Sequence, residues 1–97
     1  MSERVERGFT VRSELGLHAR PAGEFVVMAG RFESEISVGN GREWVDGRSV
    51  LSLLSLAAGR GVELRIRAIG PDAEEAVEAL GALIERTHAE IERSAAG

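Results

Sequence analysis

The sequence predicts an α+β fold, a two-layer open-faced sandwich in which three helices cover one face of a four-stranded antiparallel sheet. Segments with an apolar period of two alternate with segments of helical period in the order βαββαβα. The clearest strand pattern, residues 62–69, has apolar side chains on one side and charged ones on the other, as in a sheet with one solvated face. The 97 residues suffice for one hydrophobic core, so we expect a single domain over residues 1–97.

The first half of the chain predicts a strand, a helix and a hairpin. Apolar residues keep a period of two over residues 5–11, as on a half-buried strand. The Asn40–Gly41 pair favours a tight hairpin turn, whose strands would cover Ile36–Val38 and residues 42–45. Over residues 18–29 the period is helical, and the apolar stripe consists of Ala22, Phe25, Val26 and Ala29.

The second half predicts a helix, a central strand and one long C-terminal helix. Ser49 begins a helical pattern that Gly59 and Gly61 are placed to stop. The strand over residues 62–69 would bury about four side chains, each worth roughly 1.5–3 kcal/mol on full burial, which favours a central position. Pro71–Asp72 then opens a helix with acidic residues in its first turn, where the helix dipole favours them. Its buried stripe would consist of Ala76, Val77, Leu80, Leu83, Ile84 and Ile91.

Composition and charge exclude several classes of function. The formal net charge of −4 gives no basic surface for nucleic acid. Without cysteine there is no disulfide or thiolate site, and two widely separated histidines form no ligand cluster, so we expect no metal and no cofactor. No stretch approaches the roughly 18 uninterrupted apolar residues of a membrane span, and the N-terminus lacks the plan of a signal peptide. We therefore expect a cytoplasmic protein that does not insert into membranes.

The segment Leu15–Ala22 lies where the first strand gives way to the first helix. A helix start offers unpaired backbone N–H groups and the positive end of the helix dipole, which together bind anions. Pro21 fits the first turn, and Gly16 gives the approaching loop backbone freedom. Neutral imidazole, here His18, is a nucleophile near pH 7, and Arg20 can grip phosphate oxygens with two parallel hydrogen bonds. These groups suit phosphoryl transfer, although an ordinary polar helix start is the commoner use of such residues.

The run Gly16–Ala22 resembles the phosphohistidine signature of the HPr family, the phosphocarriers of the bacterial phosphoenolpyruvate-dependent sugar phosphotransferase system. Phe25–Val26 follow at the family's spacing, and residues 49–61 resemble its regulatory-serine segment. The resemblance extends from about Val5 to Glu85, and the family's HPr-like fold has the element order that the periodicity predicts.

The resemblance implies a carrier rather than an enzyme. Enzyme I, charged from phosphoenolpyruvate, would give its phosphoryl group to Nδ1 of His18, and the carrier would pass it to the IIA component of a sugar transporter. Arg20 would contact the phosphate, and the helix start Ala19–Pro21 would receive the anion. We expect the carrier to act as a monomer.

Ser49 has two compatible interpretations. Serine is a preferred helix N-cap, worth about 1 kcal/mol over alanine. In many Gram-positive relatives the matching serine is phosphorylated by HPr kinase, and a charge added beside the docking surface would hinder transfer at the histidine. The resemblance therefore makes Ser49 a candidate regulatory phosphosite.

Partners of the family dock on the first two helices, which implies Gly23, Arg48, Val50 and Leu51 as contact residues. Val50 also fits the core stripe of the second helix, whereas Leu51 fits it poorly and is the better interface candidate. Enteric relatives carry lysines around the histidine where this chain has the uncharged Val27, Gly30 and Ser52. Because such rim charges mainly set association rates, exchange with a foreign enzyme I should be inefficient. His88, on the last helix, is interpreted as an ordinary surface residue.

Two other functions share these features. A paralogous carrier in a nitrogen-related or other regulatory phosphorelay would have the same site and differ only in its partners. A regulatory binding module that is not phosphorylated would use the fold alone, and His18 would then be dispensable. The presence of His18 counts against the module.

Overall fold

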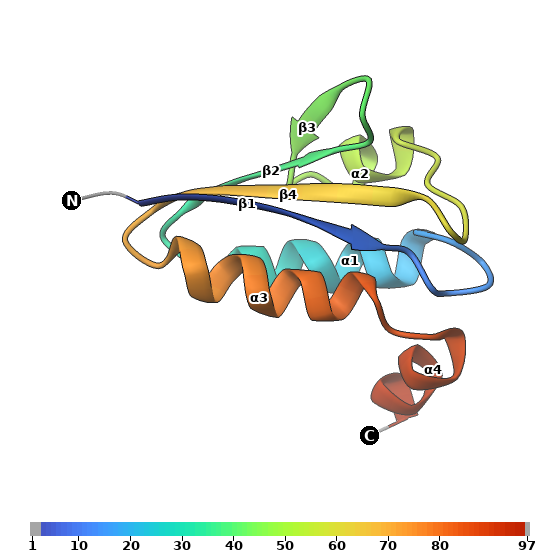
Figure 1. Cartoon of the computed structure of the whole chain (residues 1–97). Helices are drawn as coiled ribbons and strands as arrows, with labels where there is room; N and C mark the ends of the chain where they lie inside the picture. The colour runs from blue at the N-terminus through green and yellow to red at the C-terminus, as the bar shows by residue number, and fades with distance from the viewer. Residues whose placement is uncertain (1–2, 97) are drawn as a thin grey trace.

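The computed structural model describes residues 3–96, with side chains described for residues 3–93. Figure 1 shows α1 and α3 packed together beneath one face of the sheet, while α2 contacts α1 and β3. This arrangement confirms the predicted α+β sandwich. Within the described residues, no helix combines the length and the apolar character that crossing a membrane requires. The elements are β1 (Glu3–Thr10), α1 (Ala19–Ala29), β2 (Glu35–Gly39), β3 (Trp44–Asp46), α2 (Val50–Ser55), β4 (Glu63–Gly70), α3 (Ala73–Ile84) and α4 (His88–Ala96).

The sheet has the strand order β1-β4-β2-β3, and every neighbouring pair is antiparallel. The central position predicted for β4 is confirmed, since β4 pairs with both β1 and β2. Its apolar residues Leu64, Ile66 and Ala68 are fully buried against the helices. Val62 was predicted to share this stripe, but it lies just before the strand and is exposed.

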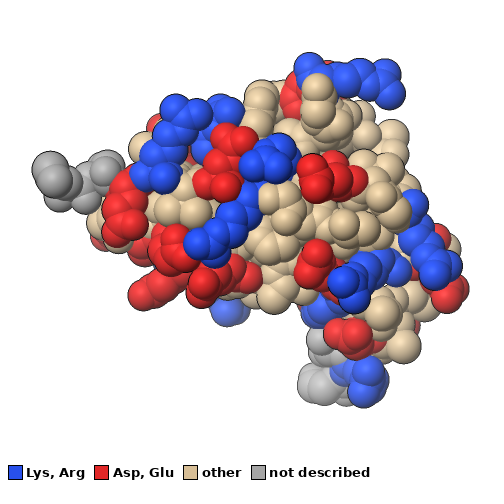
Figure 2. Space-filling model, viewed as in Figure 1, with Lys and Arg blue, Asp and Glu red and all other residues tan. Residues whose placement is uncertain are grey.

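Charged and aromatic side chains pack together on the solvated face of the sheet. Glu6 of β1 pairs in register with Arg67, and its carboxylate accepts hydrogen bonds from Nε of Arg65 at 2.9 Å and Nε of Arg67 at 3.1 Å. The Trp44 ring stacks on the Arg67 guanidinium, whose Cζ lies 3.8 Å from the ring centroid. Over the face in Figure 2, basic side chains lie beside most of the acidic ones.

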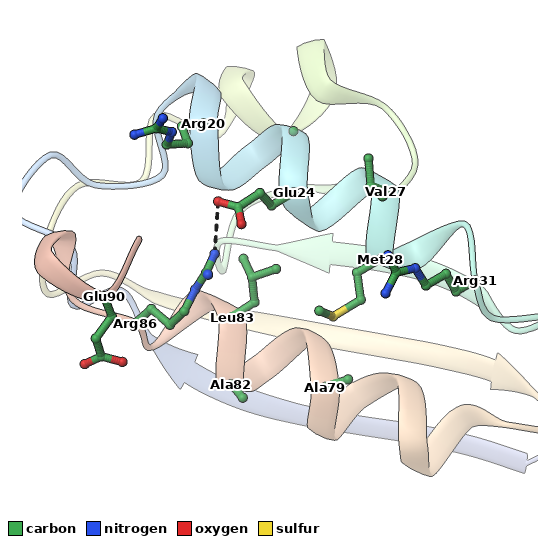
Figure 3. Close-up of a pocket in the computed structure, with 11 residues that line it drawn as sticks. Arg20, Glu24, Val27, Met28, Arg31, Ala79, Ala82, Leu83, Arg86 and Glu90 are labelled. Carbon is green, nitrogen blue, oxygen red and sulfur yellow. Dashed lines mark ion pairs between the residues drawn. The ribbon is translucent and has the colours of Figure 1, made fainter. Parts of the chain in front are cut away.

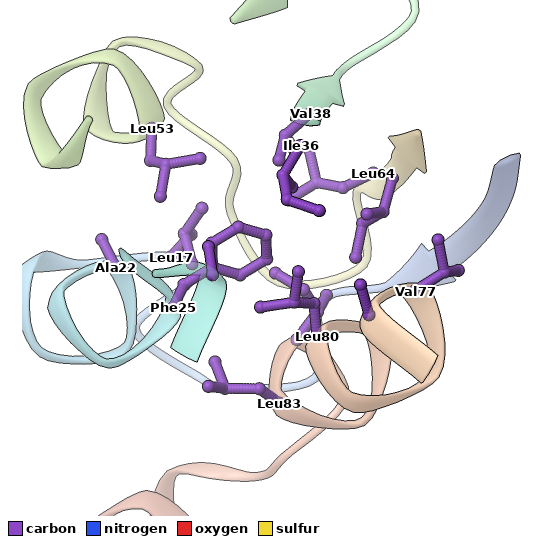
Figure 4. Packing of buried hydrophobic residues seen from close by; sticks show 14 of the residues in the cluster. Leu17, Ala22, Phe25, Ile36, Val38, Leu53, Leu64, Val77, Leu80 and Leu83 are labelled. Carbon is purple, nitrogen blue, oxygen red and sulfur yellow. The ribbon is translucent and has the colours of Figure 1, made fainter. Parts of the chain in front are cut away.

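The core fixes the position of α1. Phe25 is fully buried and points from α1 into the space between α2, α3 and the sheet (Figure 4). Leu53 of α2 and Leu80 of α3 are fully buried around it. Burial of each such side chain stabilises the fold by roughly 1.5–3 kcal/mol, so the helix that begins after His18 is firmly seated.

The prediction of a single C-terminal helix is wrong, because α3 ends at Ile84 and a fourth helix begins at His88. Thr87 starts the new helix. Its Oγ1 accepts a hydrogen bond from the N–H of Glu90 at 3.3 Å and donates one to Oε1 of Glu90 at 3.1 Å. Thr-x-x-Glu is the sequence pattern of a capping box, and here its threonine half is formed, since Oγ1 of Thr87 caps the N–H of Glu90. Ile91 is buried as predicted, but it belongs to the separate α4.

The second helix is shorter than predicted. It ends at Ser55, before either glycine, because Ala57 adopts a left-handed backbone with a φ of +50°. The N–H groups of Leu56 and Ala57 bond back to Leu53 and Leu54, which tightens the last turn. The chain after α2 therefore turns early toward the loop that precedes α1.

Asp72, at the start of α3, holds the loop between α1 and β2 instead of capping its own helix. Its carboxylate accepts hydrogen bonds from the Ser34 hydroxyl at 2.6 Å, the Ser34 N–H at 3.0 Å and the Glu33 N–H at 2.9 Å. The Ser34 hydroxyl bond, followed by the Glu33 N–H bond, lowers the pKa of Asp72 below its ordinary value of 3.8.

We expect Asp72→Asn to lower the free energy of unfolding at pH 7. A depressed folded-state pKa contributes stability that is present above the unfolded pKa and is lost as the pH falls through the folded value. The gap in urea midpoint between wild type and Asp72→Asn should therefore narrow between pH 7 and pH values below 3.8. An equal gap at both pH values would show that the Asp72 charge does not stabilise the fold.

Two helical glycines provide a matched test of the packing. A Cβ on Gly81 of α3 would lie 2.1 Å from Cε1 and Cζ of Phe9. The Phe9 ring, from β1, therefore packs directly on this glycine. Gly23 of α1 has no such neighbour within 4 Å. We expect Gly81→Ala to lower the free energy of unfolding by about 1–3 kcal/mol through overpacking. Gly23→Ala should raise it by about 0.5–1 kcal/mol, because alanine favours a helix interior. Urea unfolding of both variants checks this, and a stabilised Gly81→Ala would contradict the contact.

Candidate functional site

The loop before α1 is held by backbone hydrogen bonds. The N–H of Leu17 donates to the carbonyl of Ala58 at 2.8 Å, and the N–H of Gly16 donates to the carbonyl of Ser13 at 2.9 Å. Gly16 has a φ of +71°, and a Cβ there would lie 2.5 Å from the Ala58 oxygen. Only glycine meets both demands without strain. This loop therefore presents His18 at a defined place on the surface.

His18 is the N-cap residue of α1. Its backbone is extended, with φ −85° and ψ −174°, and its carbonyl accepts from the N–H of Ala22 at 3.1 Å. The side chain makes no capping hydrogen bond, so the imidazole is left free for other chemistry. Nε2 is shielded from solvent and has no hydrogen-bond partner among the described residues, and the residue as a whole is half-buried.

The start of α1 supplies an anion site beside the imidazole. The N–H groups of Ala19 and Arg20 have no partner within the helix, and Pro21 has no N–H to satisfy. The first turn of α1, which is described in full, contains no acidic residue that would neutralise the positive helix end. The predicted cradle, Ala19–Pro21, thus lies directly after the candidate nucleophile.

Arg20 is beside this site but is paired with α4. Its Nη1 lies 2.6 Å from Oε1 of Glu92. Nε2 of His88 lies 4.0 Å from the same oxygen, and the His88 and His18 ring centroids are 6.3 Å apart. His88 is thus not an isolated surface residue, and sequence reasoning missed both His88 and Glu92. The signal available in the sequence was the Thr-x-x-Glu pattern at Thr87, which favours a new helix start two residues after Glu85, where the family resemblance ends.

Among the described residues, no group of three or more His, Cys, Asp or Glu side chains could hold a metal ion.

A cleft of about 840 Å³ runs between α1 and α3 and extends to Arg20. Its walls include Met28 from α1 and Leu83 from α3, which point toward each other across the space in Figure 3. The ion pair between Arg86 and Glu24, at 3.2 Å, crosses the cleft between the helices (Figure 3). The cleft adjoins the His18 site without including the imidazole.

Ser49 caps α2 as its residue type predicts. Its Oγ accepts a hydrogen bond from the N–H of Ser52 at 3.2 Å. Ser49 lies at the start of α2, whereas Ala58, which bonds the His18 loop, follows the end of the same helix. The two candidate phosphorylation sites are thus at opposite ends of α2.

The apolar candidates for partner docking differ in exposure. Leu51 is 80% exposed, whereas Val50 is half-buried and packs against the core. On α1, Val27 is 63% exposed, and Gly23 is one helical turn before it on the same side. Of the predicted apolar docking residues, Leu51 is therefore the exposed one, Gly23 and Val50 are half-buried, and Val27 adds an exposed apolar side chain that was not among them.

Arg48 is held away from His18. Its Nη2 donates to the carbonyls of Phe32 at 2.8 Å and Ser34 at 3.1 Å. Both acceptors follow the C-terminal end of α1, while His18 precedes its N-terminal end. The guanidinium thus ties two loops together and does not add charge at the imidazole.

Comparison with known proteins agrees with this geometry. A family model described as PTS HPr component phosphorylation site matches residues 5–86. The phosphocarrier protein HPr of Pseudomonas aeruginosa is 43% identical over 76 residues, covering 77% of this chain and 84% of the relative. The HPr-like protein Crh of Halalkalibacterium halodurans is 43% identical over 82 residues, covering 84% of this chain and 98% of the relative. A solved HPr from Bacillus anthracis has a TM-score of 0.81 at 39% identity, covering 84% of this chain and 98% of that chain.

The similar proteins differ in name and in assembly. They include a phosphocarrier protein NPr from Shewanella violacea, 37% identical over 82 residues that cover 84% of this chain and 90% of the relative. An HPr from Thermoanaerobacter tengcongensis, with a TM-score of 0.66 at 38% identity over 78% of this chain and 84% of that one, is described as a dimer. The monomer expected from the sequence therefore stays a prediction. With the signature around His18, the matching fold and a family model that spans most of the described chain, this protein belongs to the HPr family of phosphocarrier proteins.

Proposed function

We propose that His18 accepts a phosphoryl group from phospho-enzyme I on Nδ1 and donates it to the IIA component of a sugar transporter. The observation that carries the proposal is the imidazole at the N-cap of α1, which makes no capping hydrogen bond, has Nε2 shielded and lies beside an anion-binding helix start. We place this exchange in the cytoplasm, where the donor chain begins with phosphoenolpyruvate.

The transfer needs no base from this chain. In the tautomer that carries its proton on the buried Nε2, the Nδ1 lone pair attacks phosphorus as the phosphorus–nitrogen bond of the donor histidine breaks. The leaving imidazole takes the electron pair of that bond, and His18 keeps its own proton. The N–H groups of Ala19 and Arg20 and the guanidinium of Arg20 stabilise the charge on the phosphoryl oxygens. The reverse sequence hands the group to the next protein.

The partner surface in this proposal consists of Leu51, Val27 and Gly23, with Val50 at its edge. A partner histidine must approach Nδ1 closely, so exposed apolar residues on the adjoining helices are suited to dock it. Arg48 contributes only by holding the loops that support α2. Relatives named HPr, Crh and NPr share this fold, so a regulatory or nitrogen-related relay is the alternative, distinguished by which enzyme I and IIA proteins react.

We expect phosphoenolpyruvate and the host's own enzyme I to label the wild-type protein with an acid-labile phosphoryl group, and His18→Ala to reduce labelling to background. His88→Ala removes the only other histidine of the chain and is the matched control, which should keep its label. Acid lability is measured by loss of label at low pH, because phosphoramidate bonds hydrolyse there and phosphoesters do not. An unlabelled wild type with an active, matched enzyme I would instead favour a binding module that is not phosphorylated.

We further propose Ser49 as a site for regulatory phosphorylation by HPr kinase. The hydroxyl at a helix N-terminus supports this, because the new phosphate would be stabilised by the Ser52 N–H group that Oγ now caps. With ATP and an HPr kinase, wild type should take up acid-stable phosphate and Ser49→Ala should not. Ser49→Asn keeps an N-cap acceptor and separates loss of the hydroxyl from the roughly 1 kcal/mol loss of the cap. Equal labelling of wild type and both variants would refute the assignment.

A further inference from the structure

The helix α4 is an addition to the shared family fold. The family match ends at Arg86, and α4 occupies residues His88–Ala96 beyond it. The sheet, the three other helices and the His18 loop are complete without it. Figure 1 shows α4 turning away from α3 beside the end of the fold at which α1 begins. Its contacts therefore serve something other than formation of the family core.

One face of α4 is turned to the His18 site. His88, Ile91 and Glu92 occupy positions i, i+3 and i+4, which share a helix face. Ile91 is 1% exposed and is the buried residue among the described side chains of α4. The two polar members reach the two predicted site residues: Glu92 pairs with Arg20 at 2.6 Å, and the His88 ring lies 6.3 Å from that of His18. The helix is thus held by one apolar anchor and by the site itself.

The carboxylate of Glu92 binds the same guanidinium that the proposed function assigns to the phosphoryl group. Both groups present negatively charged oxygens to the same guanidinium, and a phosphoryl group on His18 would bring up to two negative charges next to Glu92. Two anions that contact one guanidinium repel each other, so a phosphoryl group on His18 would weaken the hold of Arg20 on Glu92. Phosphorylation and the Glu92 contact therefore oppose each other.

We propose that Glu92 is an internal competitor for the phosphoryl group, which holds Arg20 in the unphosphorylated protein and releases it, with undocking of α4, when His18 becomes phosphorylated. The proposal rests on the assignment of His18 as the phosphoryl acceptor. Glu92 then acts as a residue of this chain that sets how readily the site takes an anion, a role outside the family's shared residues.

The contact is suited to exchange because it is partly solvated. The side chains of Arg20 and Glu92 are 43% and 52% exposed, and ion pairs at such exposure are weak. Nε2 of His18 and Nδ1 of His88 are both buried without a hydrogen-bond partner among the described residues. Undocking of α4 would give Nδ1 of His88 access to water, which offsets part of the loss of Ile91 burial.

The direct test uses inorganic phosphate, followed by NMR shifts of the backbone N–H groups at the start of α1. We expect Glu92→Gln to bind phosphate roughly two- to fivefold more tightly than wild type, the range that a solvated ion pair accounts for. Glu75→Gln, in the exposed first turn of α3, makes the same change in net charge away from α4 and should bind phosphate as wild type does.

A second measurement follows α4 itself. Saturating phosphate should speed amide hydrogen exchange of residues 88–93 in the wild-type protein while leaving β4 unchanged. Ile91→Ser removes the apolar anchor without touching Arg20, and it should bind phosphate as tightly as Glu92→Gln does. Because α4 lies outside the core, both variants should keep the unfolding midpoint of the remaining fold.

The outcomes separate this proposal from the carrier function. Unchanged or weaker phosphate binding by Glu92→Gln would overturn the competition, whether or not enzyme I phosphorylates His18, because Glu92 would then merely orient Arg20. Tighter phosphate binding by Glu92→Gln would support the competition even if His18 took no label from enzyme I. In that second case the carrier function would be refuted and the anion exchange at Arg20 would stand.

Discussion

The position of His18 depends on a backbone hydrogen bond, 2.8 Å from the N–H of Leu17 to the carbonyl of Ala58. It joins the loop before α1 to the segment after α2, and Gly16 permits the approach because any larger residue would collide with the same carbonyl. The imidazole is therefore presented by main-chain geometry. The His18 side chain makes no capping bond, so none would have to break in the proposed phosphoryl transfer.

The rest of the fold keeps α1 from moving relative to that bond. Phe25 anchors the middle of α1 in the core. The carboxylate of Asp72 binds the loop after α1 by hydrogen bonds from Glu33 and Ser34. Held at its start, its middle and just past its end, α1 offers partners a preorganised surface. A phosphocarrier must fit a donor and an acceptor in turn, and a rigid helix lowers the entropy lost in each docking event.

Most of the fold was predictable because local pattern and tertiary position agree. Leu64 and Ile66 alternate with arginines along β4, and the helix start at His18 has its proline in the first turn. The break before α4 was missed because Ile84 and Ile91 are seven residues apart, a spacing that continues one helical stripe across the gap. The Thr-x-x-Glu pattern at Thr87 was the local signal for a new helix start, and in the structure it prevails over the apolar spacing. The pairing of Arg20 with Glu92 joins distant segments, and no local pattern encodes it.

The two ends of the described chain differ in what surrounds them. Glu3 begins β1 at the end of the sheet opposite the His18 loop, whereas α4 packs at the other end, where Glu92 contacts Arg20 (Figure 1). A purification tag or fluorescent fusion joined after α4 would thus lie nearer the surface proposed to dock donors and acceptors. The same addition placed before β1 would leave it open. Any assay of phosphoryl relay with this protein is best built on N-terminal fusions.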